Sequence, residues 1–405
     1  MVFCSSLRHY PGTLTALAIC MHLALTEEQQ LIQDTARRFA ESELGPVAAR
    51  VEEPAYRPTY LNNLKQLAEL GFMGLNVLPE YGGSGAGVVA FSLAITEVAR
   101  ACASTAVAMS VNNLVAEVIQ TIGNEAQKRA YIERICTGEY PAAGFCLSEA
   151  GAGSDPSAMK TRARRDGEDY VLNGTKMWIS NAEYAGVFVV WAVTDTQAAP
   201  GKGISCFLVE AATPGLAIGP HEHKMGQRGS STNPVIFEDC RVPASAMLGR
   251  ENDGFRIAVG ELTGGRIGIG SLALGVGSAA IDIARRYITE REQFGRRIAD
   301  FQGVQWMLAD TYTELEAARL LLMNAAFQKQ IGLPYAKAAS MAKLYASEAA
   351  NKACYTALQL MGGVGYTEAM PLERLARDAR VTTIYEGTSE IQRVIIAREL
   401  LREVA

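Results

Sequence analysis

One carboxylate near the end of the chain has the surroundings expected of a general base. Glu386 stands next to Gly387, and a segment with apolar residues at helical spacing follows. Ser389 and Gln392 have the spacing of a capping box, which predicts that a helix begins there. Gly387 would allow a ligand to approach the carboxylate closely. Most glutamates are exposed to solvent, so this residue alone is either a base or an ordinary surface carboxylate.

Two glycine-rich segments could bring the backbone close to a ligand. Residues 149–155 read Glu-Ala-Gly-Ala-Gly-Ser-Asp, and their N–H groups could bind a phosphate. The segment lacks the third glycine of a dinucleotide fingerprint and the Gly-Lys-Ser/Thr of a P-loop, so a tight surface turn is the alternative. Residues 264–270 place glycines inside a helical pattern, where each costs about 1 kcal/mol relative to Ala. Close packing against another helix, or the close approach of a flat ligand, would explain these glycines. Arg266 is either a residue that binds an anion or an ordinary surface charge.

Two further segments place polar groups at the ends of helical patterns. Residues 291–296 form a charged helix end, with Gln302 one or two turns further on. Residues 359–366 read Gln-Leu-Met-Gly-Gly-Val-Gly-Tyr, a helix end that leaves backbone groups free at a turn. Both are common features of helix ends, so they indicate a binding site only if other residues indicate a cofactor.

The elements that position these segments change type twice along the chain. Apolar residues recur at helical spacing from Thr26 towards residue 140, interrupted by a Gly/Pro loop at residues 79–87. Residues 187–193, 204–209 and 234–237 are β-branched or aromatic runs, and Asn173-Gly174 predicts a hairpin turn. The pattern is helical again after Gly254. Helix, sheet and helix in this order, without alternating βαβ units, argue against a doubly wound nucleotide fold.

The composition narrows the class of protein. A chain of 405 residues is expected to form two or three domains. A net charge of −5 argues against a nucleic-acid partner. The eight cysteines are scattered and there are only four histidines, so buried reduced thiols are expected, with no metal site and no disulfide framework. No run approaches the roughly 20 apolar residues of a membrane-spanning helix, so no membrane association is expected.

Taken together, these segments resemble the acyl-CoA dehydrogenase family from Leu23 to the C-terminus. Residues 146–158 match the first signature of the family, and residues 359–378 match the second except at Ala369. Residues 79–83, 176–181 and 224–228 are supporting matches. The resemblance implies a mainly α fold with a β domain: an N-terminal helical domain (21–140), a middle β-barrel-like domain (141–250) and a C-terminal four-helix bundle (251–405). Residues 1–20 are expected to be a disordered or cloning-derived extension.

The resemblance also implies an FAD site between the β domain and the bundle. Its expected contacts within one subunit are Phe145, Leu147, Ser148, Gly153, Ser154, Trp178, Ile179 and Ser180. Arg291 and Gln302 are expected to reach the flavin of a neighbouring subunit in a homotetramer. The remaining expected flavin contacts are Gln359, Gly362, Gly363, Thr388, Ser389 and Glu390.

An acyl-CoA is expected to contact Ser154, Thr263, Gly264, Gly265, Arg266 and Gly387. Thr263 departs from several short-chain relatives, which carry Asp there. Glu386 matches the catalytic base in its commonest location. Some branches of the family place the base near position 265, which is Gly in this chain. We expect burial to raise the pKa of Glu386 when an acyl chain expels water.

The activity implied is the FAD-dependent α,β-dehydrogenation of a short-chain acyl-CoA to a trans-2-enoyl-CoA. Glu386 removes the α-proton, the β-hydrogen leaves as hydride to the flavin, and an electron-transferring flavoprotein accepts the electrons. Residues 101–105 and 109–113 look like the short-chain branch, while medium or branched acyl chains are alternatives. The expected location is the cytoplasm of a bacterium or the mitochondrial matrix of a eukaryote.

Two alternatives to this activity differ in class. A flavin enzyme of the same fold with other chemistry is disfavoured because nitroalkane-oxidising relatives carry Asp as base and monooxygenase relatives lack the base. A non-catalytic scaffold that keeps the fold would be purified without yellow colour.

Overall fold

The computed structural model describes residues 24–403, so the extension expected at residues 1–20 lies outside the described residues. A first group of helices precedes the sheet. Thr26 begins the first of them with a capping box to Gln29, as its sequence favours. The helical pattern between residues 88 and 123 is divided into two helices, because Cys102 is extended (φ −148°, ψ 101°). These helices are α1 (Glu27–Phe39), α2 (Arg57–Glu69), α3 (Gly87–Ala101), α4 (Ala103–Ile122) and α5 (Glu125–Cys136).

The middle of the chain forms one sheet of eight strands. Its order is β6-β7-β3-β2-β4-β5-β8, and β1 pairs in parallel with β4. The strands are β1 (Ala142–Cys146), β2 (Arg162–Asp166), β3 (Asp169–Ser180), β4 (Ala185–Val193), β5 (Ile204–Glu210), β6 (Leu216–Ile218), β7 (Thr232–Pro243) and β8 (Met247–Leu248). The prediction of a mainly helical fold with a middle β domain is confirmed.

The predicted hairpin at Asn173-Gly174 is wrong. Both residues lie within β3, whose pairing with β7 shifts register between Leu172 and Gly174. Gly174 has φ +146°, and a Cβ there would lie 2.6 Å from Oγ1 of Thr161. The glycine therefore permits a close tertiary contact, which local sequence does not reveal. The turn lies earlier, between β2 and β3.

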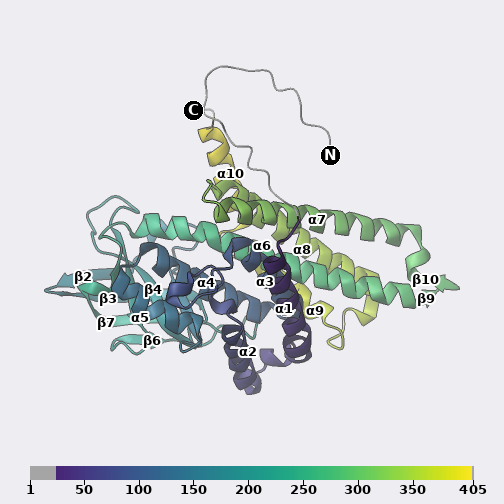
Figure 1. Cartoon of the computed structure of the whole chain (residues 1–405), viewed down its shortest axis with the longest axis horizontal. Helices are drawn as coiled ribbons and strands as arrows, with labels where there is room; N and C mark the ends of the chain where they lie inside the picture. Colours follow the sequence, from purple (N-terminus) through teal and green to yellow (C-terminus); the bar gives the residue numbers. More distant parts are fainter. Residues whose placement is uncertain (1–23, 404–405) are drawn as a thin grey trace.

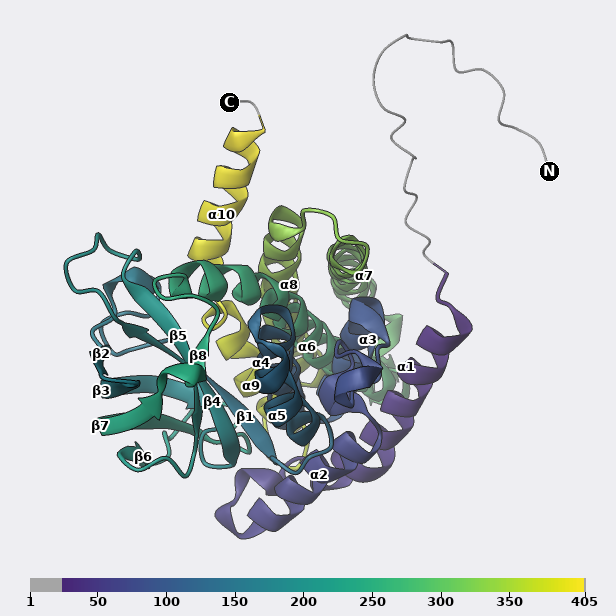
Figure 2. The same ribbon diagram turned by 60° about the vertical axis from the view of Figure 1, so that its left-hand side comes forward.

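A second group of helices follows the sheet. It comprises α6 (Gly254–Glu290), α7 (Gln302–Gln330), α8 (Ala336–Met361), α9 (Leu372–Arg380) and α10 (Ser389–Arg402), with a short hairpin of β9 (Glu292–Gln293) and β10 (Arg296–Arg297) between α6 and α7. Figure 1 shows this hairpin at the opposite end of the molecule from the sheet. Figure 2 shows α10 projecting from the body of the molecule.

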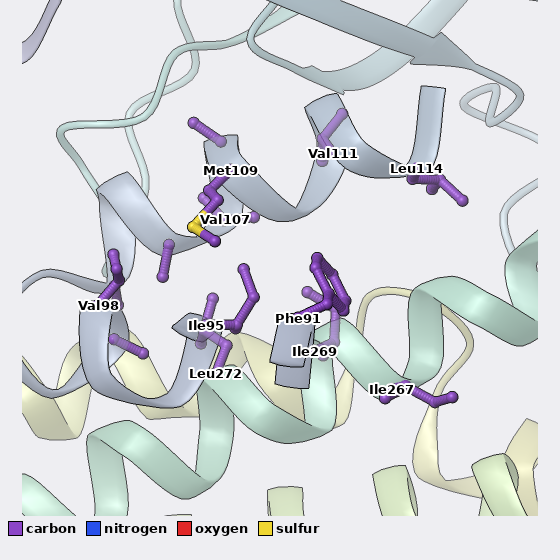
Figure 3. Close-up of a cluster of buried hydrophobic side chains, with 14 of the residues drawn as sticks. Phe91, Ile95, Val98, Val107, Met109, Val111, Leu114, Ile267, Ile269 and Leu272 are labelled. Atoms are coloured by element: carbon purple, nitrogen blue, oxygen red, sulfur yellow. The ribbon is translucent and has the colours of Figure 1, made fainter. Parts of the chain in front are cut away.

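Helix α6 is the centre of the helical core. Among the described residues it is the one helix long and apolar enough to span a membrane, yet 83% of its most apolar window is buried inside the fold. Figure 3 shows apolar side chains of α3, α4 and α6 meeting there, among them Phe91, Met109 and Ile267. A Cβ at Gly275 would lie 2.2 Å from the Thr96 carbonyl oxygen. Helix packing therefore explains this glycine.

Candidate active site

The carboxylate singled out by sequence lies in the turn before α10. Thr388 caps that helix by accepting a hydrogen bond from the backbone N–H three residues on, at 3.3 Å. The capping box predicted for Ser389 and Gln392 is therefore wrong by one residue. Nε2 of Gln392 instead donates to the carbonyl oxygens of Glu386 (3.0 Å) and Gly387 (2.9 Å).

The turn has a strained backbone. Glu386 has φ +53° and Gly387 has φ +85°. A left-handed conformation is rare for a residue with a Cβ and costs on the order of 1–3 kcal/mol, so it persists only where the surroundings hold it. Gln392 is one such group, and Nζ of Lys343 on α8 is another, donating to the Gly387 carbonyl at 2.8 Å. The direction of the Glu386 side chain is thereby fixed.

Helix α6 provides the wall that faces this carboxylate. A Cβ at Gly265 would lie 2.7 Å from Oε2 of Glu386, so the missing side chain leaves the room that the carboxylate occupies. Arg266 is buried and donates to the hydroxyl groups of Ser340 (3.4 Å) and Thr263 (3.5 Å). The surface-charge interpretation of Arg266 is therefore wrong. Of the predicted acyl-CoA contacts, Gly265 lies against the Glu386 carboxylate and Gly387 is the next residue of the turn. Arg266 lies close enough for its charge to lower the pKa of Glu386.

The surroundings of Glu386 perturb its ionisation. Oε2 of Glu386 is buried and has no hydrogen-bond partner within residues 24–403. Burial raises the pKa of Glu386 to about 7, although the charges of Arg266 and Lys343 oppose the rise. The side chains of the protein alone are thus sufficient to bring the pKa of this carboxyl near neutrality, where a general base is most effective.

A second group of charges lies one residue along α6. A Cβ at Gly264 would lie 2.5 Å from Nζ of Lys329, which forms an ion pair with Glu117. Burial and the charge of Glu117 raise the pKa of nearby Glu261 to about 7. These residues, like Lys343, were not found from the sequence, because isolated charges on helices carry no motif.

The predicted flavin contacts of the β domain also come together. The N–H of Met177 donates to the Ser148 carbonyl at 2.9 Å, which joins β3 to the segment after β1. Lys176, fully buried, donates to the Leu147 carbonyl (3.1 Å) and forms an ion pair with Glu149 (2.8 Å). The segment from Leu147 to Glu149 is therefore held against Lys176 and Met177, directly before Trp178. The glycine-rich segment is a tight turn at the surface, as its sequence favours: backbone hydrogen bonds between Glu149 and Ala152 (3.0 and 3.3 Å) close it, and Gly151 and Gly153 are exposed. The buried ion pair of Glu149 with Lys176 anchors this turn to β3.

Two of the predicted flavin contacts, Trp178 in β3 and Ser389 at the start of α10, have features that suit a large flat cofactor. Trp178 adopts φ +59° and leaves 51% of its surface exposed, although a large aromatic side chain is usually buried. The hydroxyl of Ser389 is buried and unpartnered in the part of the chain that the structure describes. An aromatic face and a free hydroxyl are groups that a flavin could engage.

The remaining predicted contacts lie elsewhere on the molecule. Arg291 and Gln302 flank the β9–β10 hairpin, at the far end from the sheet (Figure 1), and their side chains are exposed. Gln359, Gly362 and Gly363 at the end of α8 are exposed as well. Within one chain, Arg291 and Gln302 do not meet the residues of the β domain. Phe294 in the same hairpin is 93% exposed.

Comparison with known proteins agrees with this arrangement. Family models match in three parts: "Acyl-CoA dehydrogenase, N-terminal domain" at residues 26–139, "middle domain" at 144–240 and "C-terminal domain" at 252–401. The human mitochondrial short-chain specific acyl-CoA dehydrogenase is 47% identical over 385 residues, covering 95% of this chain and 92% of its own. The acryloyl-CoA reductase (NADH) of Anaerotignum propionicum is 44% identical over 384 residues, covering 94% and 96%.

Comparison with solved structures indicates the same family. The structure of butyryl-CoA dehydrogenase from Megasphaera elsdenii superposes with a TM-score of 0.90 at 37% identity, covering 94% of this chain and all of that one. The chain therefore belongs to the acyl-CoA dehydrogenase family, oxidoreductases that act on the CH–CH bond of acyl-CoA thioesters. FAD is the cofactor of this family.

Proposed function

We propose that the protein dehydrogenates short-chain acyl-CoA thioesters to trans-2-enoyl-CoA, with Glu386 as the base that removes the α-proton. The observation that carries this proposal is a carboxylate on a strained turn, with one oxygen buried and unpartnered among the described residues, facing a helix that lacks a side chain at position 265. A carboxyl with a pKa of about 7 is half ionised at neutral pH and can take up a proton during the reaction.

The surrounding residues have complementary tasks. An α-proton is too weakly acidic for an unassisted carboxylate, so the developing enolate must also be stabilised. The backbone N–H of Glu386, in the same fixed turn, is the donor that we assign to the thioester carbonyl. Arg266 and Lys343 supply positive charge beside the reacting group. FAD, when bound by the β domain and by residues 388–390, supplies a two-electron acceptor for the β-hydrogen.

The preference for a short acyl chain is supported by the wall of α6. Gly268 lies one helical turn from Gly265, about 4.5 Å along the axis. A Cβ at Gly268 would lie 2.4 Å from the Ser110 hydroxyl and 3.2 Å from the Phe91 ring. An acyl chain that runs along α6 in this direction therefore meets side chains within a few carbon atoms.

We further propose the partners and the organisation expected of the family. The residues predicted at 21–140, 141–250 and 251–405 would act as three domains, and a homotetramer would bring Arg291 and Gln302 to a neighbour's flavin. An electron-transferring flavoprotein would accept the electrons, in the cytoplasm of a bacterium or in the mitochondrial matrix.

An anaerobic titration tests the proposal. Butyryl-, isobutyryl- and octanoyl-CoA are added in turn to the purified holoenzyme while the visible flavin absorbance is followed. We expect butyryl-CoA to bleach the wild-type flavin and to leave Glu386→Gln unbleached. The matched control is Glu399→Gln, which removes a partly exposed carboxylate of α10 that pairs with Arg402.

Other results would contradict specific parts of the proposal. Bleaching by octanoyl-CoA or isobutyryl-CoA alone would replace the short straight chain by a longer or branched one. Bleaching of Glu386→Gln at the wild-type rate would remove Glu386 from its role. Reduction by NADH and by no acyl-CoA would favour the reverse reaction, that of the reductase from Anaerotignum propionicum.

A further inference from the structure

Lys343 is a buried cation in a hydrogen-bonding position that a neutral side chain could also fill. Its side chain is fully buried on α8, and its ammonium donates to the carbonyl oxygen of Gly387 at 2.8 Å. Burying a charge is costly, and neutral donors such as Ser, Thr or Gln would satisfy a carbonyl at lower cost. Gln392 already donates to that same oxygen at 2.9 Å. The position of a full charge at this point therefore needs an explanation.

We propose that Lys343 is a positioning residue for the catalytic base: its ammonium locks the turn at Gly387 and keeps the Glu386 carboxylate ionised and directed at α6. This inference rests on the proposed function. The hydrogen bond from Lys343 is made at the strained part of the backbone, because Gly387 has φ +85° and Glu386 before it has φ +53°. Lys343 and Gln392 together hold the two successive carbonyl groups of the turn. Without them the backbone could relax to an unstrained conformation and carry the carboxylate away.

The charges around the turn support the proposal that Lys343 keeps Glu386 ionised. Lys343 faces Glu386 on the turn, Arg266 on α6, Glu390 on α10 and Glu348 on its own helix. Glu386 faces Arg266 and Lys343. Burial lowers the pKa of Lys343 to about 8, so the ammonium remains mainly protonated at neutral pH. Its charge therefore counteracts the burial of Glu386 over the pH range in which the base must be ionised.

Two substitutions separate the charge from the hydrogen bond. Lys343→Met keeps an unbranched side chain one atom shorter and loses both, whereas Lys343→Gln loses the charge and keeps a donor group. Lys352→Met is the matched control, since Lys352 lies on the same helix, is exposed and pairs with Glu314. Flavin content, the dissociation constant for butyryl-CoA and the limiting rate of flavin reduction are measured from pH 5.5 to 9 in anaerobic stopped flow. The pKa of the Glu386 carboxyl is read independently by infrared difference spectroscopy, with Glu386→Gln to identify its band.

We expect normal flavin content and substrate affinity in both variants. Removing a nearby positive charge should raise the pKa of Glu386 by about one unit in both Lys343 variants. The same shift should appear in the infrared titration and in the pH below which the rate of flavin reduction falls. Lys343→Met should also reduce flavin about 10²-fold more slowly, because the carboxylate is displaced. Lys343→Gln should lose much less, and Lys352→Met should match wild type.

The deciding result is the pKa of Glu386. An unchanged infrared pKa and acid limb in Lys343→Gln would overturn the proposal, and this holds even if Lys343→Met fails to fold. A loss confined to flavin content or stability would likewise reduce Lys343 to a structural residue. If wild type is not reduced by any acyl-CoA, the proposed function fails, while the infrared pKa still decides whether Lys343 acts on Glu386.

Discussion

A single methyl group on α6 should separate stability from catalysis. The substitution is Gly265→Ala, whose Cβ would lie 2.7 Å from Oε2 and 3.1 Å from the carboxyl carbon of Glu386. Favourable contact between heavy atoms requires about 3.5 Å, so the carboxylate must retreat by about 0.5–1 Å. A misplacement of that size costs up to about 10²-fold in rate. In contrast, Ala in place of a helical Gly is worth about 1 kcal/mol of stability.

The matched variant is Gly260→Ala, five residues earlier on the same helix. This glycine is exposed, and among the described residues nothing lies within 4 Å of its would-be Cβ. We expect Gly260→Ala to gain stability and to keep the wild-type rate of flavin reduction. Gly265→Ala should keep its flavin and a melting temperature no lower than wild type, while its limiting rate falls. Wild-type rates in Gly265→Ala would refute the assignment of the carboxylate position on which the mechanism rests.

Three more predictions follow from the same structure. The value of kcat/KM should fall as the pH drops through about 7, because Glu386 has a pKa raised to about 7 by burial and its protonated form cannot act as a base; a profile flat down to pH 5 would contradict this. Lys176→Met should destabilise the fold by about 3–5 kcal/mol in denaturant titration, since it leaves Glu149 buried without its partner, and an unchanged midpoint would show that the pair contributes nothing. Arg291→Ala should change stability by less than about 0.5 kcal/mol, as expected for an exposed side chain, yet lower the flavin content of the purified protein; full flavin occupancy would argue against its role.

The sequence predicted what depends on motifs and periodicity. The order of helix, sheet and helix was recoverable because apolar spacing changes period twice, and Glu386 was identified because several segments matched one family together. Local rules failed where a distant residue decides the conformation. The glycine at 174 accommodates Thr161 instead of forming a hairpin turn, and Gln392 holds the turn at Glu386 instead of capping its own helix. The sequence around Lys343 does not predict its role, because its hydrogen-bond partner is in the turn 44 residues further along the chain.

The separation between the sheet and the β9–β10 hairpin has a consequence for how the protein acquires its cofactor. If the predicted contacts at both ends serve one flavin, no single chain can enclose it, and two copies must meet before binding is complete. Cofactor retention then becomes a concentration-dependent property, linked by mass action to assembly. Dilution would release flavin from an otherwise folded polypeptide, and excess flavin would drive subunits together. In such a protein the yellow colour would report the extent of assembly as well as the presence of the cofactor.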